Sequence, residues 1–445
     1  MSAAPGGRPA DADWSSRHLH FVGIGGAGMS GLALIAHALG ADVSGSDRSE
    51  SSYTTRLREH GIEPAIGHDA ANVPPGAEVV YSTAVPTDNP ERQAARGREL
   101  HRADLLAQIA AVKRCLAVTG THGKTTTAAM IVHILRASGL DPAYVVGGEL
   151  RGTGANAGWG SGDWIVIEAD ESDRSLLRLH PEIAVLTNAE LDHHATYSSR
   201  LDLEATLREF MGRASLNAVV WDRPGLRALC PPDAIAYDAP ETTVSVHGSR
   251  FAWRGIEVSL TVPVVHNAIN AAGALTAAAL AGADPDRAAA GLPDFQGARR
   301  RFELLGQTPG GVAVYDDYAH HPTEVAATIA AARTLAPARL VAVFQPHLYS
   351  RTRALAHEFG RALAGADLSV VLAVYPARER AEDFPGVDGH LIAAAAADAA
   401  AGRPVAWMPT FDDARAYLAN TLRQGDLCLM MGAGDVDTLA RSLVA

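Results

Sequence analysis

A glycine-rich turn that ends in a lysine and three threonines is the clearest chemical signal in this chain. It reads VTGTHGKTTT over residues 118–127, between an apolar run at 115–118 that predicts a buried strand and apolar residues that predict a helix. In such a turn the glycines let backbone N–H groups approach phosphate oxygens, and the helix N-terminus adds positive partial charge. Lys124 is expected on the β- and γ-phosphates and the Thr125 hydroxyl on a magnesium ion. The standard spacing has glycine at position 118, where this chain has valine, so the motif is a variant; an ordinary strand–helix turn is the alternative.

Lysine is otherwise almost absent. Of the 38 basic residues only Lys113 and Lys124 are lysines, and all the others are arginines. A compact ammonium group fits inside a nest of backbone N–H groups, whereas a guanidinium group is a broad planar fork. The placement of Lys124 therefore supports the phosphate role. Because no lysine follows Lys124, no downstream lysine can act in catalysis.

A second glycine turn, GIGGAG over residues 23–28, lies between a predicted strand at 18–22 and a predicted helix at 29–39. The next predicted strand, at 42–46, ends at Asp47. This arrangement predicts a dinucleotide, or more broadly any nucleoside diphosphate, on the helix N-terminus, with Asp47 near a ribose or base. A tight turn that serves packing alone is the alternative.

Acidic residues and histidines follow other predicted strands, where parallel α/β sheets gather their chemistry. Glu168 and His193 each follow an apolar run and are candidate metal ligands. Carboxylates bind Mg²⁺ directly, whereas imidazole is an unusual Mg²⁺ ligand and would also accept Mn²⁺. A solvated acidic turn over 168–173 and a surface histidine pair are the alternatives.

The segment DDYAHH at 316–321 places four titratable groups at the end of a predicted strand. That density indicates a site more than a structural role. Three arginines at 299–301 could supply fixed positive charge to a transferring phosphoryl group. A solvated basic turn is the alternative for the arginines.

Composition narrows the class of protein. The 445 residues are too many for one core, and 47% hydrophobic and 20% charged residues are ordinary for globular domains. A net charge of −12 without a long Lys/Arg run argues against nucleic acid as a partner. No apolar stretch approaches the ~20 residues that span a membrane. The cysteines Cys115, Cys230 and Cys428 are far apart, as in reduced thiols, and residues 1–17 have the composition of a disordered tail and not of a signal peptide. We therefore expect a cytoplasmic protein without a membrane partner, either a monomer or a homodimer.

Strand and helix patterns alternate along the chain, which predicts an α/β protein with mostly parallel sheets. We expect three domains, over residues 18–112, 113–305 and 306–445. The first and third would be Rossmann-like, and the central one a P-loop-type nucleotide-binding domain. An alternating stretch at 243–262 predicts a small antiparallel patch within the central domain.

Taken together, these motifs resemble those of the Mur ligase family. The matching segments run in order over nearly the whole chain beyond residue 17, and jointly they are highly specific. They are GIGGAGMSG at 23–31, TGTHGKTT at 119–126, EADESD at 168–173, TN at 187–188 with DH at 192–193, HN at 266–267 with Asn270, RRFE at 300–303, DDYAHHPTE at 316–324 and QPH at 345–347.

The resemblance implies an ATP-dependent ligase with small-molecule substrates. ATP would convert the carboxylate of UDP-N-acetylmuramate to an acyl phosphate, and the amine of L-alanine would attack it and release phosphate. The first domain would bind the UDP-sugar, the second ATP and Mg²⁺, and the third the amino acid. A recycling ligase that joins a murein tripeptide to the same UDP-sugar is the alternative.

The resemblance also implies residue roles. Catalytic candidates are Lys124, His193, Arg301, Asp317, His320, His321 and His347. Contacts with ATP are expected from Gly120, Thr121, His122, Gly123, Lys124, Thr125, Thr126, His266, Asn267, Asn270, Arg301 and Asp317. Expected metal ligands are Thr125, Glu168 and His193. Contacts with the UDP-sugar are expected from Gly25, Gly26, Ala27, Gly28, Met29, Ser30, Asp47, Ser82 and Asn188.

Three features depart from the family pattern, and two other classes of protein compete with it. Val264 and Val265 precede the His-Asn pair, where the family usually has a glycine, and Leu348 stands where an arginine usually follows QPH. No lysine follows the Asp-His motif, so a second metal would need other ligands. A nicotinamide dehydrogenase would explain the first glycine turn but not the lysine turn, and a regulatory nucleotide-binding module would not explain the groups at 316–321.

Overall fold

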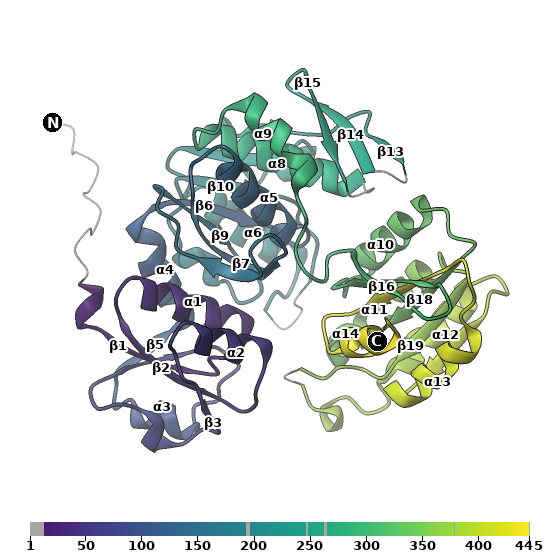
Figure 1. Cartoon of the computed structure of the whole chain (residues 1–445), viewed down its shortest axis with the longest axis horizontal. Coiled ribbons are helices and arrows are strands. Elements are labelled where there is room, and N and C mark those ends of the chain that lie inside the picture. The colour runs from purple at the N-terminus through teal and green to yellow at the C-terminus, as the bar shows by residue number, and fades with distance from the viewer. Residues whose placement is uncertain (1–12, 193–195, 246–247, 262–264, 378, 445) are drawn as a thin grey trace.

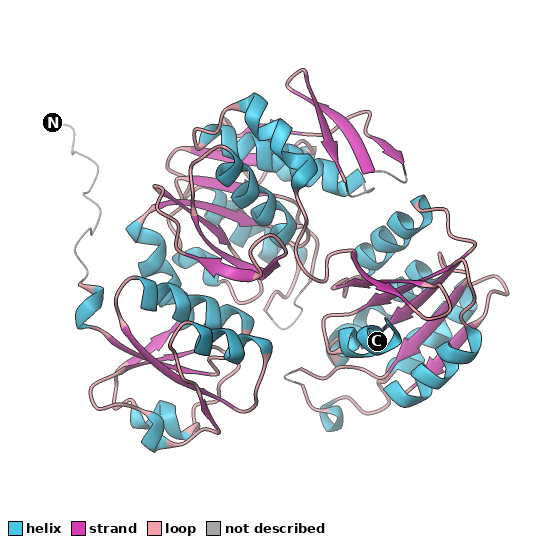
Figure 2. Cartoon of the chain, in the orientation of Figure 1, coloured by secondary structure: helices cyan, strands magenta, loops and turns pink. Residues whose placement is uncertain are grey.

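The computed structural model describes residues 13–192, 196–245, 248–261, 265–377 and 379–444. The chain forms three α/β units, each with its own sheet, around a common centre (Figure 1). Helices cover the sheets on both faces, and strands and helices alternate along most of the chain (Figure 2). The predicted α/β class with mostly parallel sheets is confirmed.

The first unit has a five-stranded parallel sheet in the order β3-β2-β1-β4-β5. Strand β1 leads through the first glycine turn into α1, as the sequence predicts. The elements are β1 (His18–Val22), α1 (Ala27–Ala38), β2 (Asp42–Asp47), α2 (Ser52–Glu59), β3 (Ala65–Ile66), β4 (Glu78–Tyr81), α3 (Pro90–Ala94), β5 (Glu99–His101) and α4 (Arg102–Val112).

The central unit has a seven-stranded sheet in the order β12-β11-β10-β6-β9-β7-β8, parallel except for β8. The predicted antiparallel patch is present as β13-β14-β15. The elements are β6 (Arg114–Thr119), α5 (Lys124–Ala137), β7 (Ala143–Leu150), β8 (Ala155–Gly158), β9 (Trp164–Glu168), β10 (Ile183–Leu186), α6 (Arg200–Met211), β11 (Asn217–Trp221), α7 (Pro224–Arg227), β12 (Ile235–Tyr237), β13 (Thr243–Ser245), β14 (Gly248–Trp253), β15 (Ile256–Leu260), α8 (Val265–Leu280) and α9 (Pro285–Gly291).

The third unit has a six-stranded sheet in the order β16-β17-β21-β18-β19-β20, in which only the edge strand β16 is antiparallel. The elements are β16 (Glu303–Gln307), β17 (Ala313–Asp317), α10 (Pro322–Thr334), β18 (Arg339–Phe344), α11 (Tyr349–Leu363), β19 (Leu368–Leu372), α12 (Gly389–Ala399), β20 (Val405–Met408), α13 (Phe411–Thr421), β21 (Asp426–Met431) and α14 (Val436–Val444). The expected domain bounds remain proposals; β16 already pairs within the third sheet from Glu303.

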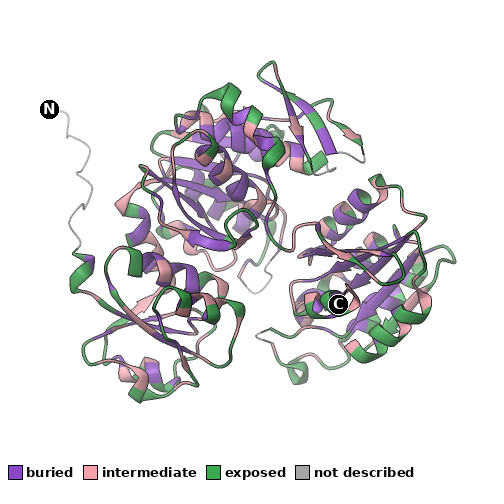
Figure 3. Ribbon diagram, viewed as in Figure 1, coloured by how far each residue is buried: buried purple, intermediate pink, exposed green. Residues whose placement is uncertain are grey.

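Burial follows the sheets. The strands at the centre of each unit are buried, and exposed residues concentrate on the outer helices (Figure 3). Strands β9 and β10 are continuous apolar runs because helices cover both faces of their sheet. This burial makes the carboxyl ends of the strands the accessible edge on which polar side chains can gather.

The expected disordered tail is wrong for residues 13–17. Residues Trp14–Ser16 form a 3₁₀ turn, and the Trp14 side chain is buried in the core of the first unit. Residues 1–12 lie outside the described part of the chain. Within the part that the structure describes, no helix combines the length and apolar character needed to cross a bilayer.

Candidate functional site

The lysine turn is shaped by two glycines that no other residue could replace without strain. Gly120 has φ +125°, and a Cβ there would lie 2.3 Å from Thr187 Oγ1. Gly123 has φ +78°, and a Cβ there would lie 2.8 Å from Asn270 Oδ1. Both positions combine a left-handed backbone with close neighbours, so the turn is fitted to its surroundings.

Asn188, which follows β10, supports this turn. The His122 N–H donates to Asn188 Oδ1 (2.8 Å), and Asn188 Nδ2 donates to the His122 carbonyl (2.9 Å). The Thr187 hydroxyl donates to the same carbonyl at 2.7 Å. The sequence predicted a contact of Asn188 with the UDP-sugar, which stays a prediction; the structure shows its side chain bonded to the phosphate turn.

Lys124 is the first residue of α5 and its ammonium group is held inside the turn. Its Nζ donates to the carbonyls of Gly120 (2.7 Å) and Thr121 (3.1 Å) and to Glu171 Oε2 (2.8 Å). Burial alone would lower the pKa of Lys124, but the carboxylates around it, Glu171 first, raise the pKa above its usual value. The ammonium group is therefore a permanent cation, and phosphate oxygens would compete with Glu171 for it.

The other lysine lies outside the turn. Lys113 Nζ donates to the carbonyls of Gly160 (2.9 Å) and Gly162, and it lies 4.7 Å from the centroid of the Trp159 ring. Burial lowers the pKa of Lys113. The surroundings therefore shift the pKa values of the two lysines in opposite directions.

Thr125 and Glu168 form an oxygen-rich pair beside the turn. The Thr125 hydroxyl donates to Glu168 Oε1 (3.0 Å), and the Gly147 N–H donates to Glu168 Oε2 (2.6 Å). Arg301 Nη2 donates to Thr125 Oγ1 at 3.2 Å. A hydroxyl and a carboxylate are the hard oxygen donors that Mg²⁺ prefers, so this pair fits such an ion. The third expected ligand, His193, lies outside the described residues.

A cavity of about 340 Å³ opens between the three units at this point. It reaches from the N-terminus of α1 to the start of α11, so one ligand in it would contact all three domains. Its polar lining residues are Arg102, Thr121, Lys124, Thr125, Glu168, Asp170, Ser172, Asp192, Arg301, Tyr318, His320, Glu324, His347 and Arg351.

A second cavity of about 280 Å³ lies on the other side of the phosphate turn. Its lining combines aromatic and amide groups, the mixture expected around a nucleotide base and sugar. The residues expected to contact ATP that line it are His122, Gly123, Thr126, His266, Asn267, Asn270, Arg301 and Asp317.

Asp317 ties the linker between the second and third units to this cavity. Its carboxylate accepts the backbone N–H groups of Phe302 (2.7 Å) and Ala319 (2.8 Å). Burial raises the pKa of Asp317 to about 6, although Arg301 opposes the shift. Arg301 itself lies between two residues with left-handed backbones, Arg300 (φ 57°) and Phe302 (φ 52°).

The third unit contributes two histidines and an arginine to the 340 Å³ cavity. The rings of His320 and His347 lie 6.0 Å apart, and Arg351 Nη1 lies 3.1 Å from His347 Nδ1. Burial lowers the pKa of His320 to about 4, so its imidazole is neutral near pH 7. Leu348, with φ +71°, lines the same cavity at the position where the family has an arginine.

Arg351 also joins the third unit to the central one. Its guanidinium group donates to both carboxylate oxygens of Asp192, each at 3.1 Å. Both side chains are only 4% exposed. A buried bidentate pair of this kind is sensitive to the loss of either partner.

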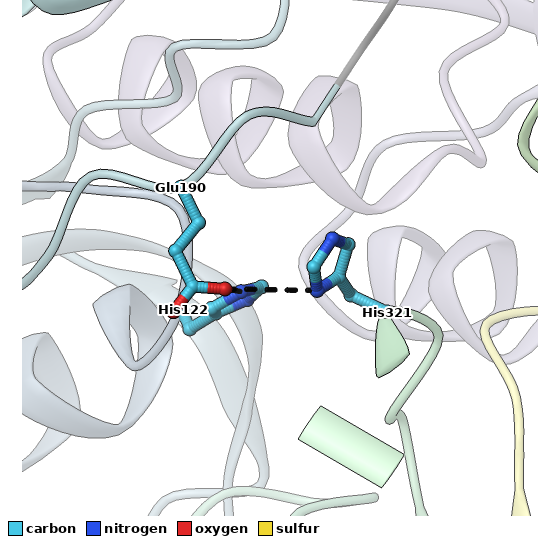
Figure 4. A group of neighbouring side chains, drawn as sticks. All are labelled: His122, Glu190 and His321. Atoms are coloured by element: carbon cyan, nitrogen blue, oxygen red, sulfur yellow. Dashed lines mark hydrogen bonds and ion pairs between the residues drawn. The ribbon is translucent and has the colours of Figure 1, made fainter. Parts of the chain in front are cut away.

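His321 points away from His320 and belongs to a different contact between the same two units. Its ring lies 4.8 Å from that of His122, next to Glu190 (Figure 4). Glu190 Oε2 accepts the hydroxyl of Thr323 (2.6 Å), and Glu324 Oε1 lies 3.1 Å from His122 Nδ1. Burial alone would lower the pKa of His122, but Glu190 and Glu324 raise it to about 9.

The first glycine turn has the expected strand–turn–helix context. The N–H of Gly25 donates to Asp47 Oδ2 (2.8 Å), so Asp47 holds the turn itself. Gly26 is the N-cap of α1, and Ser82 follows β4 at the same edge of the sheet. Met29 and Ser30 are buried. Of the residues predicted for the UDP-sugar, these lie together at the carboxyl ends of the strands.

An arginine-rich cavity of about 440 Å³ adjoins this turn. It lies between the N-termini of α1 and α2 and the linker at 299–301, and it would suit an anionic ligand. Its lining residues are Ala27, Ser52, Tyr53, Gly147, Gly148, Glu149, Arg299, Arg300, Arg301, Tyr318, Asp437 and Arg441.

Several site residues were not singled out from the sequence. Glu171 stood inside EADESD as an unassigned acid, and Glu190 lies between the TN and DH pairs. Glu324 follows His321 at the spacing of a capping box, which the structure shows. Arg351 had no local signal, because its partner Asp192 is 159 residues away in the chain.

These features define a multidomain nucleotide-dependent enzyme. The central unit has a phosphate-binding turn, a pair of oxygen ligands suited to Mg²⁺ and a cavity suited to a nucleotide, and the third α/β unit closes over them. The chain belongs to the Mur ligase family: three family models match it in order. They are the Mur ligase family catalytic domain (residues 18–114), the Mur ligase middle domain (118–278) and the Mur ligase glutamate ligase domain (300–434).

Curated relatives match over almost the full length. The UDP-N-acetylmuramate–L-alanine ligase of Mycobacterium sp. (strain JLS) is 44% identical, over 96% of this chain and 95% of that protein. The enzyme of the same name from Acidithiobacillus ferrooxidans (strain ATCC 53993 / BNL-5-31) is 42% identical, over 95% and 96%.

Solved structures of similar ligases share the fold of this chain over nearly its full length. The UDP-N-acetylmuramate–alanine ligase of Thermotoga maritima superposes with a TM-score of 0.82 at 28% identity, over 96% of this chain and 98% of that one. A murein peptide ligase from Psychrobacter arcticus shares the fold, with a TM-score of 0.70 at 23% identity, over 96% and 98%.

Proposed function

We propose that this chain joins L-alanine to the carboxylate of UDP-N-acetylmuramate with ATP, releasing ADP and phosphate. The observation that carries the proposal is the 340 Å³ cavity, which contains the phosphate turn and to which all three units contribute. Relatives named for this activity are 41–44% identical over nearly the whole chain. The likeness to the tripeptide-joining ligase is lower and supports the fold alone, so the recycling reaction is the less favoured reading.

The chemistry follows from how the charged groups are placed. Lys124 and Arg301 would neutralise the γ-phosphoryl group during its transfer to the substrate carboxylate. Thr125 and Glu168, with His193, would hold Mg²⁺, or Mn²⁺ in its place, and such an ion would offset negative charge on the phosphates. The UDP-sugar would lie along the first glycine turn and the 440 Å³ arginine-rich cavity. Closure of the domains excludes water from an acyl phosphate that hydrolyses readily.

L-Alanine would bind where the third unit contributes His320, His347 and Arg351 to the cavity. Its carboxylate would pair with Arg351 and share that guanidinium group with Asp192, because Arg351 donors face both Asp192 and His347. The neutral ring of His320 can then stand near the amine, which must lose a proton before it attacks.

Replacing Arg351 with lysine should raise the KM for L-alanine at least about tenfold, because a single ammonium group cannot contact both Asp192 and the alanine carboxylate as the guanidinium fork can. The KM for ATP and the affinity for UDP-N-acetylmuramate should change little. Steady-state kinetics with each substrate varied in turn is the measurement, with Arg353→Lys, an exposed neighbour on α11, as the control. Equal effects on all three substrates would remove Arg351 from the alanine site.

The route through an acyl phosphate has a direct test. With ¹⁸O in the carboxylate of UDP-N-acetylmuramate, one label should appear in the phosphate released in each turnover. Mass spectrometry of the phosphate detects it. Unlabelled phosphate during full turnover with alanine would exclude carboxylate phosphorylation and, with it, the proposed mechanism.

A cytoplasmic location and a monomeric or homodimeric state are part of the same proposal. They agree with the −12 net charge and the unpaired thiols of Cys115, Cys230 and Cys428. Sedimentation of the full chain distinguishes the two oligomeric states.

A further inference from the structure

We propose that His122, Glu190 and His321 bind a transition-metal ion of the Zn²⁺ class across the interface between the central and third units. Among the described residues, their ligand atoms lie within 4.8 Å of one another (Figure 4). His122 Nε2 lies 3.3 Å from Glu190 Oε2, and His321 Nδ1 lies 3.9 Å from the same oxygen. Ligand atoms at tetrahedral zinc are about 3.3 Å apart, given bonds of about 2.0–2.1 Å. The first separation already fits, and the His321 ring would move closer to both partners, since the three ligand atoms are separated by up to 4.8 Å.

The donor set is the one that zinc selects. Two imidazoles and one carboxylate form a His₂Glu site, which leaves a fourth position for water or for an oxygen of a ligand. Magnesium prefers oxygen donors in octahedral geometry, so the pair Thr125 and Glu168 remains the better place for it. The two sites are therefore chemically distinct, although the same turn contributes to both.

The surroundings orient the ligands as metal sites require. Glu324 Oε1 lies 3.1 Å from His122 Nδ1, so it holds the ring with Nε2 facing Glu190. A carboxylate behind a histidine in this way fixes the tautomer and raises the basicity of the ligating nitrogen. His321 Nδ1 accepts the N–H of Thr323 at 3.4 Å, so it is the unprotonated nitrogen of the ring, and a metal ion would take over the lone pair that now makes this long hydrogen bond. This nitrogen lies on the side of the ring that faces Glu190.

Without a metal ion, a proton would occupy Nε2 of His122, the nitrogen that faces Glu190. His122 lies between two carboxylates, with Nδ1 3.1 Å from Glu324 Oε1 and Nε2 3.3 Å from Glu190 Oε2. A metal ion would displace that proton from Nε2 and leave the contact with Glu324 intact. Because His122 and Glu190 belong to the central unit and His321 to the third, the complete site exists only while the two units are in contact.

Binding is best measured on untagged full-length protein without nucleotide, with Mg²⁺ in excess. Co²⁺ serves as the visible probe, since tetrahedral coordination gives intense absorption, and Zn²⁺ is then titrated by competition. We expect one ion per chain. The variants His122→Gln and His321→Gln should each weaken Zn²⁺ at least about a hundredfold, and Glu324→Gln about tenfold. The control is His357→Gln, which removes an exposed histidine from α11.

Folding is checked by thermal unfolding without metal and by binding of UDP-N-acetylmuramate, which uses the first unit. Should one histidine variant fail to fold, Glu190→Gln tests the same site from the central unit. Absence of a tetrahedral Co²⁺ spectrum in the wild type would overturn the proposal. So would unchanged Zn²⁺ affinity in any folded variant of the three ligands. Neither result depends on the ligase activity, so the proposed function is judged separately.

Discussion

Replacing Lys124 with alanine should reduce ligation by about a thousandfold or more while leaving the affinity for UDP-N-acetylmuramate nearly unchanged. Lys124 is the cation at the start of α5, enclosed by the carbonyls of the phosphate turn. The loss of one such preorganised group facing developing charge costs about 10²–10³ in rate, and Lys124 would also hold ATP. The sugar nucleotide lies on the first glycine turn, in another unit. Ligation rates and calorimetric binding of the UDP-sugar test the two expectations together.

The chain supplies its own matched control, because Lys113→Ala removes the only other lysine. It should leave the rate within about twofold. Lys124→Ala alone leaves the buried carboxylate of Glu171 without the cation that pairs with it, which should destabilise the fold. The double variant Lys124→Ala/Glu171→Gln removes that charge and should recover thermal stability but not activity. If the UDP-sugar affinity fell as far as the activity, the two phosphate sites would have been assigned wrongly.

Replacing Glu168 with glutamine should lower kcat by about a hundredfold at limiting Mg²⁺ and by much less at saturating Mg²⁺. The amide keeps the shape of the side chain, but it has one acceptor oxygen where the carboxylate accepts from both Thr125 and Gly147. It also lacks the charge that offsets the dehydration of Mg²⁺. A metal effect therefore appears as a shift in the Mg²⁺ concentration for half-maximal rate.

The control for this change is Glu182→Gln, at the opposite end of the same sheet, where Glu182 pairs with Arg114. It should leave the Mg²⁺ dependence unaltered. An equal loss at low and high Mg²⁺ in Glu168→Gln would mean that Glu168 acts through the backbone of β7 and not through the ion.

Local patterns in the sequence predicted those parts of the site that are local in structure. The strand before Gly120, the helix after Lys124 and the acid at the end of β9 could be predicted because each depends on neighbours a few residues away. The short edge strands β8, β12 and β20 were not predicted, because pairing with a neighbouring strand stabilises them more than their own hydrophobic pattern does.

Contacts between the units could not be predicted from local sequence patterns. Glu324 and Arg351 gain their partners only when the third sheet packs against the central one, across sequence separations of 202 and 159 residues. The contact of Asn188 with the phosphate turn was not foreseen for the same reason: its residue type suits either turn, and only the order of strands in the sheet shows which turn it adjoins. His193 lies outside the described residues, and its role stays a prediction.

The contrast between the two lysines has a practical consequence for chemical labelling. Amine-reactive reagents attack neutral amines. Lys124, enclosed and held charged, should react slowly, whereas Lys113, whose pKa is lowered, presents more of the reactive form. Acylation at mildly alkaline pH should therefore modify Lys113, which precedes β6 at the end of that strand opposite the phosphate turn. It should spare Lys124, whose ammonium group the reaction needs. Among the lysines, a fluorophore or a surface anchor would thus be directed to Lys113 and away from Lys124, with the enzyme still active.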